Sequence, residues 1–136
     1  MATRKATKQK TKRKPSKWTN AFIALVEVNG WPKPEQEVLF HKAGFIYQKR
    51  RMWRFDMAWP DLMLAVELDG MVFRPNSGHT SALGLSSDRV KDAVAQLMGW
   101  TVIRFTEVHF RQKDVEPIME AAFDYCRKQQ TTEVTA

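Results

Sequence analysis

Residues 53–70 read WRFDMAWPDLMLAVELDG, and this stretch decides the fold. Apolar residues recur at every second position over residues 53–59 and again over 62–69, which is the pattern of β-strands that bury one face. Pro60 and Asp61 separate the two runs and favour a turn. The stretch therefore predicts a β-hairpin with two or four loop residues. One face is expected to carry Trp53, Phe55, Met57 and Trp59, and the other Arg54, Asp56 and Ala58.

The acidic residues of the predicted hairpin gather on one face. Pairing Trp59 with Leu62 makes Asp56 and Glu67 diagonal neighbours, with backbones about 7–8 Å apart. Asp69 follows Glu67 on the same face, roughly 6.5 Å further along the strand. We therefore expect three carboxylates to converge there.

The neighbours of these acids allow two interpretations. Ala58 and Ala65 are small and leave room beside the acids, and carboxylates a few ångströms apart repel one another unless a cation lies between them. Hard oxygen ligands in this arrangement suit Mg²⁺ or Mn²⁺. In the alternative interpretation the face is solvated, and Glu67 pairs with Arg54, which the predicted register places directly opposite.

The rest of the chain completes an α/β plan with flanking helices around a mixed sheet, in the order α-β-β-β-α-β-α. Periodicity and turn residues predict a helix over 18–29, a strand over 37–41, a long loop over 71–87, a helix from Ser86 or Ser87 to Gly99, a strand over 101–105 and a helix from about Asp114. We expect one domain over residues 18–129, after a disordered basic arm at 1–17 and before a frayed tail at 130–136.

Basic residues are unevenly distributed along the chain. The formal net charge is +7, and eight of the 22 Lys and Arg residues lie within residues 1–17, which contain none of the 15 acids. Such an arm favours a polyanion, because each basic residue near a phosphate releases counterions. A solubilising tail, a localisation signal and a membrane-surface contact are the alternatives. The expected DNA-binding residues are Lys10, Lys12, Arg13, Lys14, Lys49, Arg50, Arg51 and Arg54.

Cysteine usage and hydropathy bear on the compartment. The single cysteine, Cys126, lies on an apolar face of the last predicted helix, so no disulfide can form within the chain. The sequence has no apolar run of membrane-spanning length and no signal-peptide pattern. We therefore expect a cytoplasmic protein of a bacterial or phage-infected cell that has no membrane partner. A homodimer and a monomer both remain open.

Four segments together resemble a known group of enzymes. They are WRFDMAWPDLMLAVELDG, the loop with Gly78, His79 and Thr80, the DRVK segment, and GWTVIRF. This combination is similar to the PD-(D/E)XK nuclease superfamily, in the small branch of very-short-patch-repair-like endonucleases, and the similarity runs from about Trp18 to Phe110. It implies a restriction-endonuclease-like core and a Mg²⁺-dependent endodeoxyribonuclease whose metal ligands are Asp56 and Glu67. It also implies a role in DNA repair, recombination or phage DNA processing.

The chain departs from the superfamily pattern at two places. Asp69 stands where the usual lysine follows the second acid, and Lys91 on the next helix is the candidate to replace it as a catalytic residue. His79 is a candidate general base or phosphate contact. In the alternative interpretations Lys91 forms an ion pair on a solvated helix face, and His79 is merely exposed. Many relatives also carry a glutamate in the first helix, where this chain has Thr19 and Asn20.

Three functional hypotheses follow from these departures. The first is a metal-dependent DNA endonuclease in which Asp69 joins Asp56 and Glu67 at the metal. The second is a non-catalytic nucleic-acid-binding protein on a degenerate nuclease fold. The third is a basic protein that assembles on structured RNA.

Overall fold

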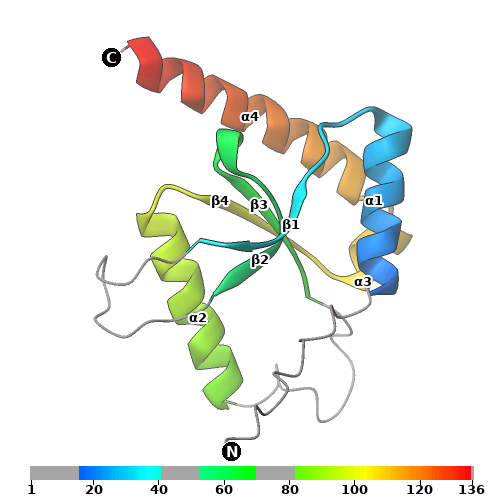
Figure 1. The fold of residues 1–136 in the computed structure, drawn as a ribbon. Coiled ribbons are helices and arrows are strands. Elements are labelled where there is room, and N and C mark those ends of the chain that lie inside the picture. Colours follow the sequence, from blue (N-terminus) through cyan, green and yellow to red (C-terminus); the bar gives the residue numbers. More distant parts are fainter. Residues whose placement is uncertain (1–15, 41–52, 70–81, 136) are drawn as a thin grey trace, which may run out of the picture.

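A computed structural model of the chain describes residues 16–40, 53–69 and 82–135. Its elements are α1 (Lys17–Asn29), β1 (Glu35–Leu39), β2 (Arg54–Trp59), η1 (Pro60–Leu62), β3 (Leu64–Leu68), α2 (Ala82–Leu97), β4 (Thr101–Phe105), α3 (Glu107–Arg111) and α4 (Val115–Thr135). The strands form one sheet in the order β1-β2-β3-β4. β2 is antiparallel to both β1 and β3, while β4 runs parallel to β3. The predicted α/β class, with a mixed four-stranded sheet and flanking helices, is confirmed (Figure 1).

The predicted hairpin is present as β2 and β3, but its register differs from the prediction. Trp59 pairs with Leu64 rather than Leu62, and Ala58 pairs with Ala65. The cause is the connection: Pro60 begins a short 3-10 helix, and the N–H of Met63 donates to the Pro60 carbonyl at 3.1 Å, so four residues make the turn. The shift of two residues places Asp56 directly opposite Glu67 instead of diagonal to it.

One face of the sheet is covered by α1 and α4 (Figure 1). Helix α1 begins where the Ser16 hydroxyl accepts a hydrogen bond from the N–H of Thr19 at 3.1 Å, and it ends at Gly30, whose φ of 66° is easily reached only by glycine. Large apolar side chains from both helices and from β2, β3 and β4 are buried here, which accounts for most of the core. The members are Phe22, Val26, Trp31, Met57, Trp59, Leu64, Val66, Phe105, Val115, Met119, Ala122, Phe123 and Cys126.

Helix α2 covers the opposite face. Ala58 and Ala65 are both 0% exposed and pack against Val94 and Ala95 of α2. The room that these alanines were expected to leave beside the acids is therefore filled by the helix, and that expectation was wrong. Small side chains instead let α2 approach the sheet closely.

The predicted alternation along β2 fails at Asp56. Phe55 does not join Met57 in the core beneath α1 and α4 but belongs to the cluster beneath α2, where its ring stacks on Phe40 with centroids 4.0 Å apart. The neighbouring strand is also irregular at this level: Glu37, which lies opposite Asp56 in the β1–β2 register, has a φ of 53°. The sheet is therefore locally distorted beside the acids.

Several element boundaries differ from those predicted. β1 lies two residues earlier than the predicted strand at 37–41, and α2 begins at Ala82, so neither Ser86 nor Ser87 caps it. The short α3 was not predicted. α4 continues to Thr135 because no Gly or Pro follows Pro117, which lies in its first turn, so the frayed tail expected at 130–136 is helical over most of its length. No helix in the described ranges is long and apolar enough to cross a membrane.

Candidate active site

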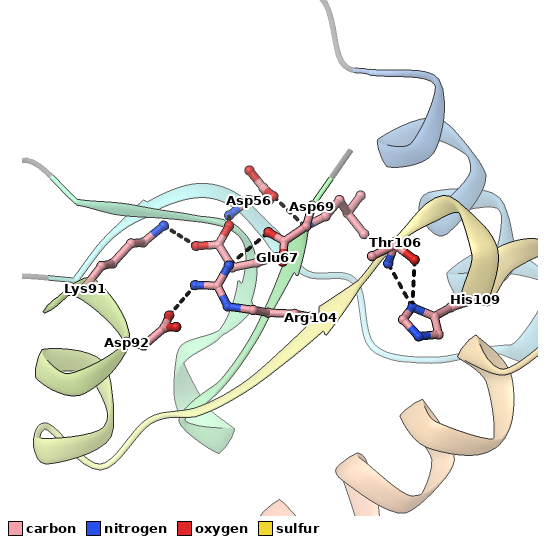
Figure 2. A network of polar contacts seen from close by, with 9 residues as sticks. Asp56, Glu67, Asp69, Lys91, Asp92, Arg104, Thr106 and His109 are labelled. Carbon is pink, nitrogen blue, oxygen red and sulfur yellow. Dashed lines mark hydrogen bonds and ion pairs between the residues drawn. The ribbon is translucent and has the colours of Figure 1, made fainter. Parts of the chain in front are cut away.

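Asp56 and Glu67 form an acid pair in which each carboxylate binds the other strand. The backbone N–H of Asp56 donates to Glu67 Oε2 at 3.4 Å, and the N–H of Leu68 donates to Asp56 Oδ2 at 2.7 Å (Figure 2). Side-chain oxygens thus accept hydrogen bonds from the N–H groups just beyond the β2–β3 pair Met57 and Val66. Both carboxylates are held by backbone at the same point of the sheet, as the sequence predicted for this face.

Lys91 on α2 completes the immediate surroundings of the acid pair. Its Nζ forms an ion pair with Glu67 Oε1 (Figure 2). It also lies 5.8 Å from the centroid of the Phe55 ring. The Lys91 side chain is 16% exposed and that of Glu67 is 6% exposed. The structure therefore brings Lys91 to the second acid. Lys91 is the cation paired with Glu67, so the alternative pairing with Arg54 on a solvated face was wrong.

Burial makes the ionised form of Glu67 unfavourable. Desolvation is the largest cause, and the negative charge of Asp56 adds to it, while the hydrogen bond and charge of Lys91 act in the opposite direction. Together they raise the pKa of Glu67 from 4.5 to about 7. A cation that lies between the two carboxylates would favour the ionised form, because it would relieve both the desolvation and the repulsion.

Asp69 lies two residues beyond Glu67, where its carboxylate is bound by arginine. Arg104 Nη1 contacts Asp69 Oδ1 at 2.9 Å, and Arg104 Nη2 forms an ion pair with Asp92 of α2 (Figure 2). We call these three residues the Arg104 clasp. Burial alone would lower the pKa of Arg104, but the hydrogen bond that Arg104 donates to Asp92 and the charges of Asp69, Asp92 and Glu67 raise it above its ordinary value. The guanidinium is therefore a permanent cation.

The donor set of the acid pair fits one hard cation. Carboxylate oxygens are the ligands that Mg²⁺ and Mn²⁺ prefer, and waters commonly complete the coordination of Mg²⁺. In the described part of the chain no group of three His, Cys, Asp or Glu residues is arranged to hold a metal ion. The acid pair could thus hold an ion through two carboxylates, with Asp69 engaged by Arg104.

The other predicted site residues are distributed as follows. Arg54 is exposed at the start of β2 and lies opposite Leu39 of β1. His79, the arm residues Lys10, Lys12, Arg13 and Lys14, and the cluster Lys49, Arg50 and Arg51 lie outside the described residues.

Sequence reasoning missed Arg104 and Asp92. Arg104 is the only charged residue of β4, between Ile103 and Phe105, and a charge in an apolar strand is the signal that could have identified it. Its partner could not be identified in the same way, because Asp92 follows Lys91 on a helix that carries several charges. A third polar group, His109, accepts the Thr106 N–H at Nδ1 over 2.9 Å and thereby closes the turn before α3 (Figure 2).

Comparison with known proteins identifies two related sequences, but neither has a described activity. The chain is similar to two uncharacterized mycobacterial proteins. They are the uncharacterized protein Rv2248 of Mycobacterium tuberculosis strain H37Rv and the uncharacterized protein MT2308 of strain CDC 1551, each 32% identical over 85 residues. The match covers 62% of this chain but only 27% of each relative, so the chain spans about a quarter of their length. No protein-family model matches the chain, and no solved structure is significantly similar to it.

Proposed function

We propose that this protein is a metal-dependent DNA endonuclease that hydrolyses phosphodiester bonds. The observation that carries the proposal is the acid pair, two backbone-held carboxylates on adjacent strands, together with the ammonium of Lys91 on the more buried of the two. The resemblance to the PD-(D/E)XK superfamily supports it, since the two acids of that pattern fall on Asp56 and Glu67. The restriction-endonuclease-like fold is part of the same proposal.

Each residue of the site has a role in this proposal. Asp56 and Glu67 hold Mg²⁺ or Mn²⁺, which when bound acidifies a water and neutralises charge developing on the phosphate. Lys91 takes the place of the lysine that Asp69 replaces: its ammonium keeps Glu67 oriented and offers a hydrogen bond to the attacking water or to the phosphate. The raised pKa of Glu67 means that this carboxyl releases a proton when a cation binds near neutral pH.

DNA is the proposed substrate because of the charge distribution. The net charge is +7, and the basic residues concentrated before residue 18 would supply sequence-independent contacts to phosphates. The exposed Arg54 lies two residues from Asp56 on the same strand, so it can help guide a phosphate toward the acid pair. His79 remains a proposed general base or phosphate contact.

A cleavage assay with matched variants tests the proposal. Purified protein is incubated with supercoiled plasmid, mismatched duplex and a four-way junction in Mg²⁺, in Mn²⁺ and in EDTA. We expect metal-dependent cutting that Asp56→Asn reduces at least about a hundredfold. Asp124→Asn is the control, because it neutralises an exposed carboxylate on α4 that forms an ion pair with Lys128. An absence of cutting on every substrate, or Asp56→Asn and Asp124→Asn cutting equally well, would refute the proposal.

A second candidate is nucleic-acid binding without catalysis. The specific observation in its favour is that Arg104 engages Asp69, which leaves two carboxylates where three were expected. On this hypothesis the protein binds DNA without cutting it in either metal, Asp56→Asn binds as well as the parent, and deletion of residues 1–15 flattens the salt dependence. A binding assay in which duplex DNA and structured RNA compete for the protein distinguishes this hypothesis from assembly on RNA, for which the RNA should bind more tightly.

A further inference from the structure

We propose that Arg104 is a positioning residue that keeps Lys91 on Glu67 by clasping α2 to the sheet. The inference rests on the proposed function and deepens it. Arg104 lies beside Glu67 in the parallel β3–β4 register, and its two terminal nitrogens contact Asp69 after β3 and Asp92 on α2. One side chain therefore joins three elements of the fold at the acid pair (Figure 2).

The packing of α2 explains why a clasp is needed. Ala58 and Ala65 lie beneath the helix and let it approach closely, and buried Phe40 and Phe55 belong to the same cluster. Where burial is described, α2 contributes buried Val94 and Ala95 and partly buried Val90. These contacts are apolar and non-directional, so they hold α2 on the sheet without fixing the direction in which the Lys91 side chain points.

Two consecutive residues supply the missing constraint. Lys91 is tied to Glu67 and Asp92 is tied to Arg104, and neighbouring residues on an α-helix point about 100° apart around its axis. Two ties in different directions at the same level restrain rotation as well as translation. Without the ion pair between Arg104 and Asp92, the ion pair between Lys91 and Glu67 is the remaining one of these two contacts between α2 and the sheet.

Arginine is suited to this position for a geometric reason. Its planar guanidinium presents several donors in fixed directions, so two carboxylates can bind it at once, whereas a lysine ammonium offers a single charged point on a flexible stem. The Arg104 side chain is 28% exposed and both terminal nitrogens are occupied by carboxylates. Arg104 is therefore engaged in contacts within the protein rather than with DNA phosphates.

The clasp also separates Asp69 from the acid pair electrostatically. The charge of Arg104 balances Asp69, so that Asp56 and Glu67 remain the carboxylates that face a cation. Removal of Arg104 is then expected to have opposite effects on two measurements. A metal ion should bind at least as tightly, because a positive charge beside the acid pair is lost, while turnover should fall, because Lys91 is no longer held in place.

The test compares Arg104→Met and Arg104→Lys with Arg111→Met, which removes an arginine on α3 that is 70% exposed. For Arg104→Met we expect kcat to fall about tenfold or more with KM changed less than about threefold. Mn²⁺ affinity, measured by electron paramagnetic resonance without DNA, should be equal or higher. Amide hydrogen exchange over residues 89–97 should accelerate. Arg104→Lys should not rescue kcat, because one ammonium cannot bridge two carboxylates in a fixed geometry.

Several results would overturn the inference. If Arg104→Met raises KM, leaves kcat unchanged and flattens the salt dependence of DNA binding, Arg104 contacts DNA instead. If Arg104→Lys restores kcat fully, the role of Arg104 is its charge and not its geometry. Unchanged amide hydrogen exchange in α2 would mean that the Arg104 clasp does not hold the helix. If Arg104→Met does not fold, Asp92→Asn tests the same tie through the same exchange measurement. If the parent cuts no DNA, the proposed function fails, while α2 exchange and Mn²⁺ affinity still decide whether the clasp exists.

Discussion

Replacing Glu67 by glutamine should make the protein more stable at pH 8. Gln has the shape of the protonated acid, so the variant mimics the state that burial and Asp56 favour. The pKa of Glu67 is raised from 4.5 to about 7, which means that folded protein keeps a proton that the unfolded chain has already lost between these values. The free energy of unfolding therefore falls as pH rises from about 4.5 to about 7 and is level above. At about 1.4 kcal/mol per pKa unit, the loss is about 3 kcal/mol.

Urea denaturation followed by tryptophan fluorescence at intervals from pH 5 to pH 8 measures this difference. The parent minus Glu67→Gln curve isolates the effect of Glu67, because the other titrating groups cancel. Glu27→Gln on the exposed surface of α1 controls for the loss of one negative charge. Curves for the parent and Glu67→Gln that stay parallel across this range would refute the reasoning. At pH 8, Mn²⁺ should stabilise the parent more than it stabilises Glu67→Gln.

Three further predictions concern the surroundings of the site. Lys91→Met should raise the pKa of Glu67 further, because the counter-charge is removed; the carboxyl ¹³C shift of Glu67 measures it, and an unchanged or lower midpoint contradicts it. Ala65→Leu should destabilise the fold by about 1–3 kcal/mol in urea, because α2 leaves no space; a neutral result would mean that the helix moves freely. Gly99→Ala should cost about 1 kcal/mol, from its φ of 91° alone, since the nearest atom to an added Cβ is 4.0 Å away; a loss several times larger would indicate a clash.

The alternation of residues 53–69 was sufficient to predict the hairpin and the shared face of its two acids. The predicted register, with Trp59 opposite Leu62, was wrong, although a shift of two residues preserves the same alternation. The 3-10 turn begun by Pro60 lengthens the connection to Met63, and the sequence pattern of the strands does not reveal that turn. The acids were therefore expected as diagonal neighbours, although they lie directly opposite each other.

Small residues were the other source of error. Ala58 and Ala65 were taken to indicate space for a metal ion, but an alanine on a sheet face is equally suited to a closely packed helix, and the sequence pattern of the strand is the same in both cases. The helix that fills the space is also the one that brings Lys91 to Glu67, while the catalytic role expected for Lys91 stays a prediction. Arg104 was missed because its partners lie on two other elements of the fold.

The positions of Lys91 and Asp69 are connected through the β3–α2–β4 unit. Parallel strands joined by a helix place that helix over their shared face, so a residue on α2 can reach a β3 side chain from above the sheet. On the proposed function, the cation that α2 supplies to Glu67 replaces the strand lysine that the nuclease pattern would place at position 69. Asp69 adds a negative charge beside the acid pair, and Arg104 on the neighbouring strand pairs with it and with Asp92 of α2. Lys91 would thus supply the charge of that lysine, and Arg104 would pair with the acid that stands in its place.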